Sequence, residues 1–257
     1  MPRYAVLLEV AGARFCGTQR QRAARTVQGA IERAVSDLDG RPRGVRLASR
    51  LDRGVDAEAL PAHCDLARHW EPAALCQALN ARLPEDLAVW AAAAVAERFH
   101  AVRDAVSKTY RYRLRVQRVR PVLDQRCWWL RRLAEPAALD ACAALLAGEL
   151  DLSAFATLRH DPSDAADPVR RIVEARWEHS EREHVLRITG SGFLYRQVRG
   201  LVGAMVAVAN GRWTVDDFAA ACRAGRGGPR LGNIAPAAGL CLERVRYDPE
   251  PPWQDAR

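Results

Sequence analysis

The most chemically suggestive stretch of the sequence is Arg50-Leu51-Asp52-Arg53-Gly54, which follows a short apolar run ending at Leu47. One acidic side chain lies there between two arginines, and Gly54 allows the chain to turn sharply. Nearby positive charge favours the ionised form of a carboxyl group, so we expect Asp52 to be charged at neutral pH. An ionised carboxylate suits a nucleophile or a general base. Taken alone, however, the pattern is more typical of a surface loop with an arginine–aspartate pair.

The charge balance of the chain favours a polyanionic partner. The 257 residues include 39 Lys and Arg against 31 Asp and Glu, which gives a net charge of +8. Nucleic acid is the usual partner of such a surface. Lys108 is the only lysine, so a GC-rich genome is an alternative explanation for the arginines. Arginine nevertheless suits phosphate, because its planar fork binds two oxygens at once.

The seven cysteines and six histidines lack the spacing of a disulfide framework or a zinc site. We therefore expect reduced thiols, no metal and no cofactor. No long uncharged apolar run is present, which predicts no membrane helix, and no secretory signal precedes the first strand-like segment. The expected location is the cytoplasm.

Apolar patterning predicts an irregular alternation of strands and helices, without the G-x-G-x-x-G loop of dinucleotide-binding folds. Expected strands cover 4–11, 44–48, 87–94, 106–116, 171–179, 184–189 and 240–247, and expected helices cover 26–38, 72–81, 136–147 and 195–209, with another opened by Thr214. This order predicts an α+β fold of two halves, each a sheet with helices on one face, whose open faces form a cleft. The predicted halves are 1–105 and 106–247, followed by a loosely ordered tail at 248–257.

Three further patterns bear on the fold and the site. Alternation in 106–116 places Tyr110 and Tyr112 on one strand face, where a core role is the simpler interpretation. The long polar loop at 148–168, with Arg159 and His160, is of a length more often functional than idle. In the 195–209 helix, Gly200 and Gly203 predict close packing.

Several motifs, taken in order, resemble the tRNA pseudouridine synthases of the TruA family. They run from residue 15 to about 247, and although each is weak alone, the ordered set is specific. The matching stretches are Phe15-Cys16-Gly17-Thr18-Gln19-Arg20-Gln21, Arg25-Thr26-Val27-Gln28-Gly29, Arg50-Leu51-Asp52-Arg53-Gly54-Val55, Leu79-Asn80-Ala81-Arg82-Leu83-Pro84, Phe99-His100-Ala101, Ser107-Lys108-Thr109-Tyr110-Arg111-Tyr112, Gly192-Phe193-Leu194-Tyr195-Arg196-Gln197-Val198-Arg199 and Ala235-Pro236-Ala237-Ala238-Gly239-Leu240-Cys241-Leu242.

The resemblance implies the pseudouridine-synthase fold, with two ferredoxin-like halves in an extended antiparallel or mixed sheet around a central cleft. It also implies a homodimer that acts on tRNA without cofactor or metal. By position, Asp52 is the catalytic aspartate with Arg50 beside it, and Tyr110 stacks on the target uracil. Arg199 and Leu240 are implied in the cleft. Arg20 and Arg103 are further candidates for RNA binding.

The sequence departs from the family pattern at four positions near the site. Thr18 replaces a tryptophan, Leu51 a threonine, Asp56 a histidine or serine, and Val102 an arginine for which Arg103 can substitute. Arg53 is a milder change, because some relatives carry a basic residue there. These changes leave the aspartate and the tyrosine in place but affect how RNA is positioned.

The leading prediction is an isomerase that converts uridine to pseudouridine in tRNA, by resemblance at positions 38–40 of the anticodon stem-loop. The alternative is a catalytically impaired or retargeted paralogue that binds structured RNA, which Leu51, Asp56 and Val102 motivate. An arginine-rich metabolic enzyme unrelated to RNA is a third possibility, and it leaves the ordered motifs unexplained.

Overall fold

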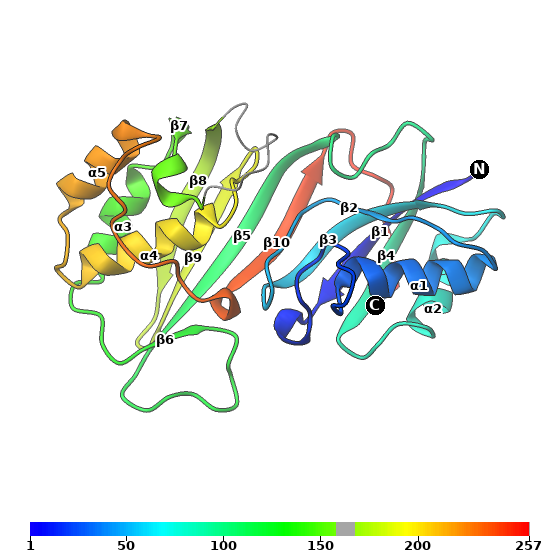
Figure 1. Ribbon diagram of the computed structural model, residues 1–257, viewed down its shortest axis with the longest axis horizontal. Helices are drawn as coiled ribbons and strands as arrows, with labels where there is room; N and C mark the ends of the chain where they lie inside the picture. Colours follow the sequence, from blue (N-terminus) through cyan, green and yellow to red (C-terminus); the bar gives the residue numbers. More distant parts are fainter. Residues whose placement is uncertain (158–167, 257) are drawn as a thin grey trace. The chain divides into compact units, whose positions relative to one another are not determined.

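The computed structural model describes residues 1–157 and 168–256, which form two compact units (Figure 1). The first unit comprises Met1–Val106 and Cys241–Arg257, and the second comprises Ser107–Leu240. The chain passes between them inside strands β5 (Ala105–Val116) and β10 (Leu240–Tyr247). Residues 241–257, which the sequence placed in a second half and a loose tail, therefore belong to the first unit.

The first unit is a sheet with strand order β11-β4-β1-β3-β10. Strand β1 pairs antiparallel with β3 and β4, β11 pairs antiparallel with β4, β2 pairs antiparallel with β3, and β10 runs parallel to β3. Helix α2 packs on β4 and contacts α1, which crosses in front of the strands (Figure 1). The elements are β1 (Arg3–Val10), α1 (Val27–Asp39), β2 (Arg46–Leu47), β3 (Asp56–Asp65), α2 (Pro72–Asn80), β4 (Leu87–Val95) and β11 (Gln254–Asp255).

Helix α1 forms where its pattern predicts. The Thr26 side chain accepts the Gly29 N–H at 3.2 Å, as an N-cap should, and Gly40 ends the helix with a positive φ of 71°. The side chains of Val27, Ile31 and Val35 lie on one helical face and are buried. The opposite face of α1 is left to solvent.

The second unit is an antiparallel sheet in the order β5-β9-β8-β7, with short strand β6 parallel to β5. Helices α3, α4 and α5 contact one another, and α3 packs on β8 (Figure 1). A mixed sheet with packed helices confirms the expected α+β class. The elements are β6 (Trp128–Leu130), α3 (Ala137–Ala144), β7 (Gly148–Asp151), β8 (Val169–His179), β9 (Glu183–Gly190), α4 (Gln197–Ala209) and α5 (Val215–Ala224).

Two glycines fix the packing of α4. A Cβ atom added at Gly200 would lie 1.8 Å from the Phe155 carbonyl oxygen, and one at Gly203 would lie 1.8 Å from the Asn233 carbonyl oxygen. Any larger residue would therefore push the backbones apart, which confirms the close packing predicted from the sequence.

The seven cysteines are free thiols, and all except Cys16 are buried. No helix of the described chain has the length and apolar character needed to cross a membrane. The expected long loop at 148–168 contains β7 and a 3-10 turn at Ser153–Phe155. Arg159 and His160, noted in that loop, lie outside the described residues.

Candidate active site

Asp52 lies in a turn between β2 and β3. The Val55 N–H donates to the Asp52 carbonyl oxygen at 3.2 Å, and Gly54 takes a positive φ of 81° that favours glycine. Leu51 and Val55 are buried, whereas Asp52 itself is half-buried. The apolar neighbours thus anchor the turn while the aspartate remains accessible.

A second loop, Phe15–Gln19, is docked against this turn through Thr18, which is only 1% exposed. The Thr18 N–H donates to the Leu51 carbonyl oxygen at 3.1 Å, its hydroxyl donates to the Ser49 carbonyl oxygen at 3.3 Å, and its Oγ1 accepts the Leu51 N–H at 2.9 Å. At Gly17, a Cβ atom would lie 2.7 Å from the Leu51 oxygen. The departure from tryptophan at position 18 therefore has a structural role, because this threonine satisfies three backbone groups beside Asp52.

We expect Thr18→Val to reduce both stability and turnover. Valine has nearly the shape of threonine but leaves the buried Leu51 N–H unsatisfied, which costs about 1–3 kcal/mol of unfolding free energy. A displaced Asp52 should lower kcat more than it raises KM. Thr18→Ser keeps the hydroxyl and should restore kcat, which urea unfolding and steady-state kinetics can measure together. A Thr18→Val enzyme with unchanged kcat would show that the contact does not position Asp52.

Two other residues at the turn are tied to their neighbours. The Arg50 guanidinium donates to the Gln19 side-chain oxygen, at 2.8 Å from Nε and 3.2 Å from Nη2, with the Gln19 amide oriented to satisfy both groups. Asp56 accepts the Gly12 N–H at 2.7 Å, and a Cβ atom at Gly12 would lie 2.1 Å from the Val55 oxygen. Asp56, another departure from the family pattern, therefore braces the far end of the turn.

The remaining candidates of the first unit lie on other segments. Arg20 follows the docked loop and forms an exposed ion pair with Glu32 at 3.3 Å. Arg103 lies in an exposed turn before β5, where its N–H donates to the His100 ring at 3.3 Å. The first unit thus brings Asp52, Arg50 and the loop leading to Arg20 together, and places Arg103 in a separate turn.

The Phe99-His100-Ala101 motif is part of the packing around β3. The Ala101 N–H donates to His63 Nδ1 at 3.1 Å, and the Tyr247 hydroxyl donates to the Ala101 carbonyl oxygen at 2.8 Å. Burial, assisted by the positive charge of Arg3, lowers the pKa of His63 to about 4. His63 is therefore neutral at pH 7, as its acceptor role requires.

Tyr110 lies on β5 in the second unit, with its side chain buried. Its ring makes an edge-on contact with Phe193, with centroids 5.3 Å apart and planes at 88°. Lys108 is two residues earlier on the same strand face. Burial lowers the pKa of this single lysine to about 8, so its charge is sensitive to modest changes in pH.

Arg199 and Leu240 are linked to β5 by one short segment. Arg199 Nε donates to the Ala235 carbonyl oxygen at 2.7 Å, and the Ala235 N–H donates to the Arg199 carbonyl oxygen at 3.0 Å. The Tyr112 hydroxyl donates to the Pro236 carbonyl oxygen at 2.7 Å. The buried Leu240 ends this segment at the start of β10.

Sequence reasoning did not single out Phe193, which contacts Tyr110, or Thr18, which contacts the Asp52 turn. Phe193 is inside a motif that had been noted for Arg199, and Thr18 was regarded only as a departure. No local sequence pattern indicates the contact of Phe193 with Tyr110 or that of Thr18 with Leu51, because each joins segments that are distant in sequence. Within the described part of the chain, no group of three or more His, Cys, Asp or Glu side chains could hold a metal ion.

Comparison with known proteins agrees with these motifs. Residues 142–248 match the model of a tRNA pseudouridine synthase family, which gives the class of protein. A tRNA pseudouridine synthase A of Cereibacter sphaeroides strain ATCC 17023 is 40% identical over 98% of this chain and 99% of its own length. Proteins of the same name from Beijerinckia indica and Solidesulfovibrio magneticus are 39% and 40% identical, over 97% and 96% of this chain and 95% and 92% of theirs. The chain belongs to the tRNA pseudouridine synthase A family.

A solved archaeal box H/ACA Nop10–Cbf5 complex is also similar. The alignment covers 96% of the present protein and 49% of the matched chain in that complex, at 9% identity and a TM-score of 0.41.

Proposed function

We propose that this protein converts uridine to pseudouridine in tRNA, with Asp52 as the catalytic carboxylate. The observation that carries the proposal is the position of Asp52, half-buried on a turn that Thr18 and Asp56 brace from both sides, in a chain whose full length matches the family. A carboxylate in such a turn is accessible to a large substrate and held in place by its backbone.

The proposed reaction breaks the bond from ribose to nitrogen 1 of uracil, turns the base, and forms a new bond from ribose to carbon 5. Carbon 5 loses a proton and nitrogen 1 gains one, so the reaction is an isomerisation in which no electrons are exchanged. Asp52 can attack the anomeric carbon of ribose, remove a ribose proton, or add to carbon 6 of the base. A covalent carboxylate intermediate is ordinary for such a group transfer.

Removing the target base from its stack costs a few kcal/mol, and stacking on an aromatic ring offsets about 1–3 kcal/mol of that. Tyr110 is proposed to supply this ring, and its hydroxyl to move the carbon 5 proton. Arg199 and Leu240 are proposed to bind substrate from the second half, and Arg20 and Arg103 from the first. Arg50, beside Asp52, completes the catalytic group.

Three finer assignments rest on the family resemblance: a target in the anticodon stem-loop, a homodimer and a cytoplasmic location. We expect light scattering on the active protein to give twice the monomer mass. A fully active monomer would rule out a required dimer.

The alternative is a paralogue that binds RNA without modifying it. The exposed Val102, in place of an arginine, favours it. By contrast, Leu51 and Asp56 lie within the braced turn, so these two departures do not by themselves indicate lost activity.

The test is a map of pseudouridine in tRNA from cells with and without the gene, together with tritium release from carbon 5 by the purified protein. We expect one or more sites to depend on the gene, and matching tritium release. Tight tRNA binding without tritium release from any tRNA would favour the binding protein instead.

A further inference from the structure

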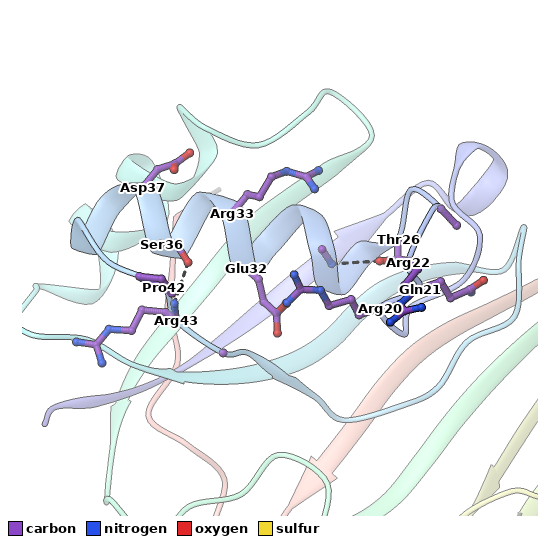
Figure 2. Close-up of a pocket in the computed structure, with 13 residues that line it drawn as sticks. Arg20, Gln21, Arg22, Thr26, Glu32, Arg33, Ser36, Asp37, Pro42 and Arg43 are labelled. Carbon is purple, nitrogen blue, oxygen red and sulfur yellow. Dashed lines mark hydrogen bonds and ion pairs between the residues drawn. The ribbon is translucent and has the colours of Figure 1, made fainter.

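A groove with a volume of about 590 Å³ runs along α1 in the first unit (Figure 2). One stripe of α1 forms its floor, the loop of Arg20 and Arg22 lies at one end, and the segment of Pro42 and Arg43 lies at the other. The α1 residues that line it are Gly29, Glu32, Arg33, Ser36 and Asp37.

The lining stripe follows helical spacing. Its positions follow the pattern i, i+3, i+4, i+7, i+8, so they share one face, opposite the face that is buried in the core. At 1.5 Å per residue, the stretch from Gly29 to Asp37 is about 12 Å long. The groove is therefore elongated and follows the exposed side of a rigid helix.

The lining carries four arginines and two acidic residues, so it is positive by two charges. Glu32 is already used, because its carboxylate binds Arg20 at 3.3 Å and accepts the Val45 N–H at 3.2 Å. Arg43 is bound to Asp39 through Nε at 2.5 Å. Of the lining side chains that the structure describes, Arg22 and Arg33 are the arginines, and Asp37 the acid, that form no ion pair.

Arg22 and Arg33 are both exposed, and neither guanidinium forms a hydrogen bond or ion pair with any residue that the structure describes. Arg33 projects from the middle of α1 toward the end where Arg22 lies (Figure 2). Two exposed guanidiniums that line one open groove can bind phosphates of the same backbone, and each can bind one bidentately.

The N-terminus of α1 does not provide an anion site of its own. The N–H groups of Val27 and Gln28 donate to the Gly17 and Thr18 carbonyl oxygens, at 3.2 and 2.9 Å, and Gly29 donates to Thr26. These contacts occupy the donors that would otherwise bind a phosphate. Side chains, rather than the helix end, must provide any anion binding in the groove.

We propose that this groove binds the sugar–phosphate backbone of the RNA substrate, with Arg22 and Arg33 as the phosphate-binding residues. The proposal rests on the proposed function for the identity of the RNA. An open, elongated groove fits a polymer backbone better than a small enclosed anion. The Arg22 loop is also continuous with Gly17 and Thr18, which brace the Asp52 turn, so bound RNA is fixed relative to the catalytic carboxylate.

The test compares Arg22→Gln/Arg33→Gln with the control Arg82→Gln/Arg98→Gln, which removes the same charge from exposed positions of the first unit outside the groove. Filter binding of tRNA to the full-length protein is measured across a salt series. Loss of two phosphate contacts should lower the slope of log affinity against log salt by about 1.4–1.8. At low salt each lost contact should weaken binding about tenfold.

Because the groove is proposed to hold RNA in place relative to Asp52, kcat/KM for tRNA should fall in the groove variant and stay near wild type in the control. Ethylation of individual tRNA phosphates should identify positions that weaken wild-type binding but no longer affect the groove variant. Equal affinity and equal salt slope in the groove variant and the control would overturn the proposal. Loss of slope in the groove variant, with a wild type that modifies no tRNA, would support the groove and overturn the proposed function.

Discussion

Asp52→Asn is expected to abolish pseudouridine formation while leaving the fold and tRNA binding intact. Asparagine has almost the same shape as aspartate, but it carries no charge and is a poor nucleophile. The loss of rate should be on the order of 10⁴-fold or more, as for other essential catalytic groups. The turn should remain folded, because the contacts of Thr18 with Ser49 and Leu51 do not involve the carboxylate.

The matched control is Asp56→Asn, the same chemical change four residues later. Its side-chain oxygen can still accept the Gly12 N–H, so the brace is kept and activity should be close to wild type. Tritium release measures activity, and filter binding should show tRNA affinity equal to or above wild type in Asp52→Asn, since removing an anion does not weaken phosphate contacts. Wild-type tritium release by Asp52→Asn would refute the catalytic assignment.

Sequence patterns correctly predicted the helices and strands that are marked by their own capping residues and apolar periodicity. Helix α1 has a capping threonine and an apolar stripe, β5 alternates polar and apolar residues, and α5 begins at the capping box of Thr214 and Asp217. These signals need no knowledge of the partner element. The predicted and observed boundaries of these elements accordingly agree within a few residues.

Strand β3 was missed because its pattern resembles no isolated strand. It begins and ends with an aspartate and contains Pro61, which lacks the N–H that a central strand normally donates. The structure places Pro61 opposite Leu7 of β1, and its carbonyl oxygen accepts the Ala48 N–H at 2.8 Å. Pairing between distant segments therefore defines this strand.

The same limit applies to the site. The aspartate could be proposed from its neighbours and from family motifs, because the relevant residues are close in sequence. The Thr18 contacts with Ser49 and Leu51 span more than thirty positions, as does the link between Arg199 and Ala235. The short tail was expected to be loose, yet β11 pairs with β4 by joining Gln254 to Ala92. Such contacts follow from the fold, not from any single stretch.

Tyr110→Phe is expected to lower the single-turnover rate by about 10²–10⁴-fold, the range for loss of a general acid or base. Phenylalanine keeps the ring and its edge-on contact with Phe193, so stacking and packing should survive. Affinity for tRNA should therefore change little. Rapid-quench measurement of tritium release gives the rate, and filter binding gives the affinity.

A second variant separates the hydroxyl from the ring. Tyr110→Leu removes both, so it should match the rate loss of Tyr110→Phe and also weaken the flipped-base complex by about 1–3 kcal/mol, the contribution of one stacked base. If Tyr110→Phe instead turns over at the wild-type rate and only Tyr110→Leu is impaired, the ring alone is required. The carbon 5 proton would then leave through another group. Lys108, on the same face of β5 and with its pKa lowered to about 8 by burial, would be the first residue to test in that role.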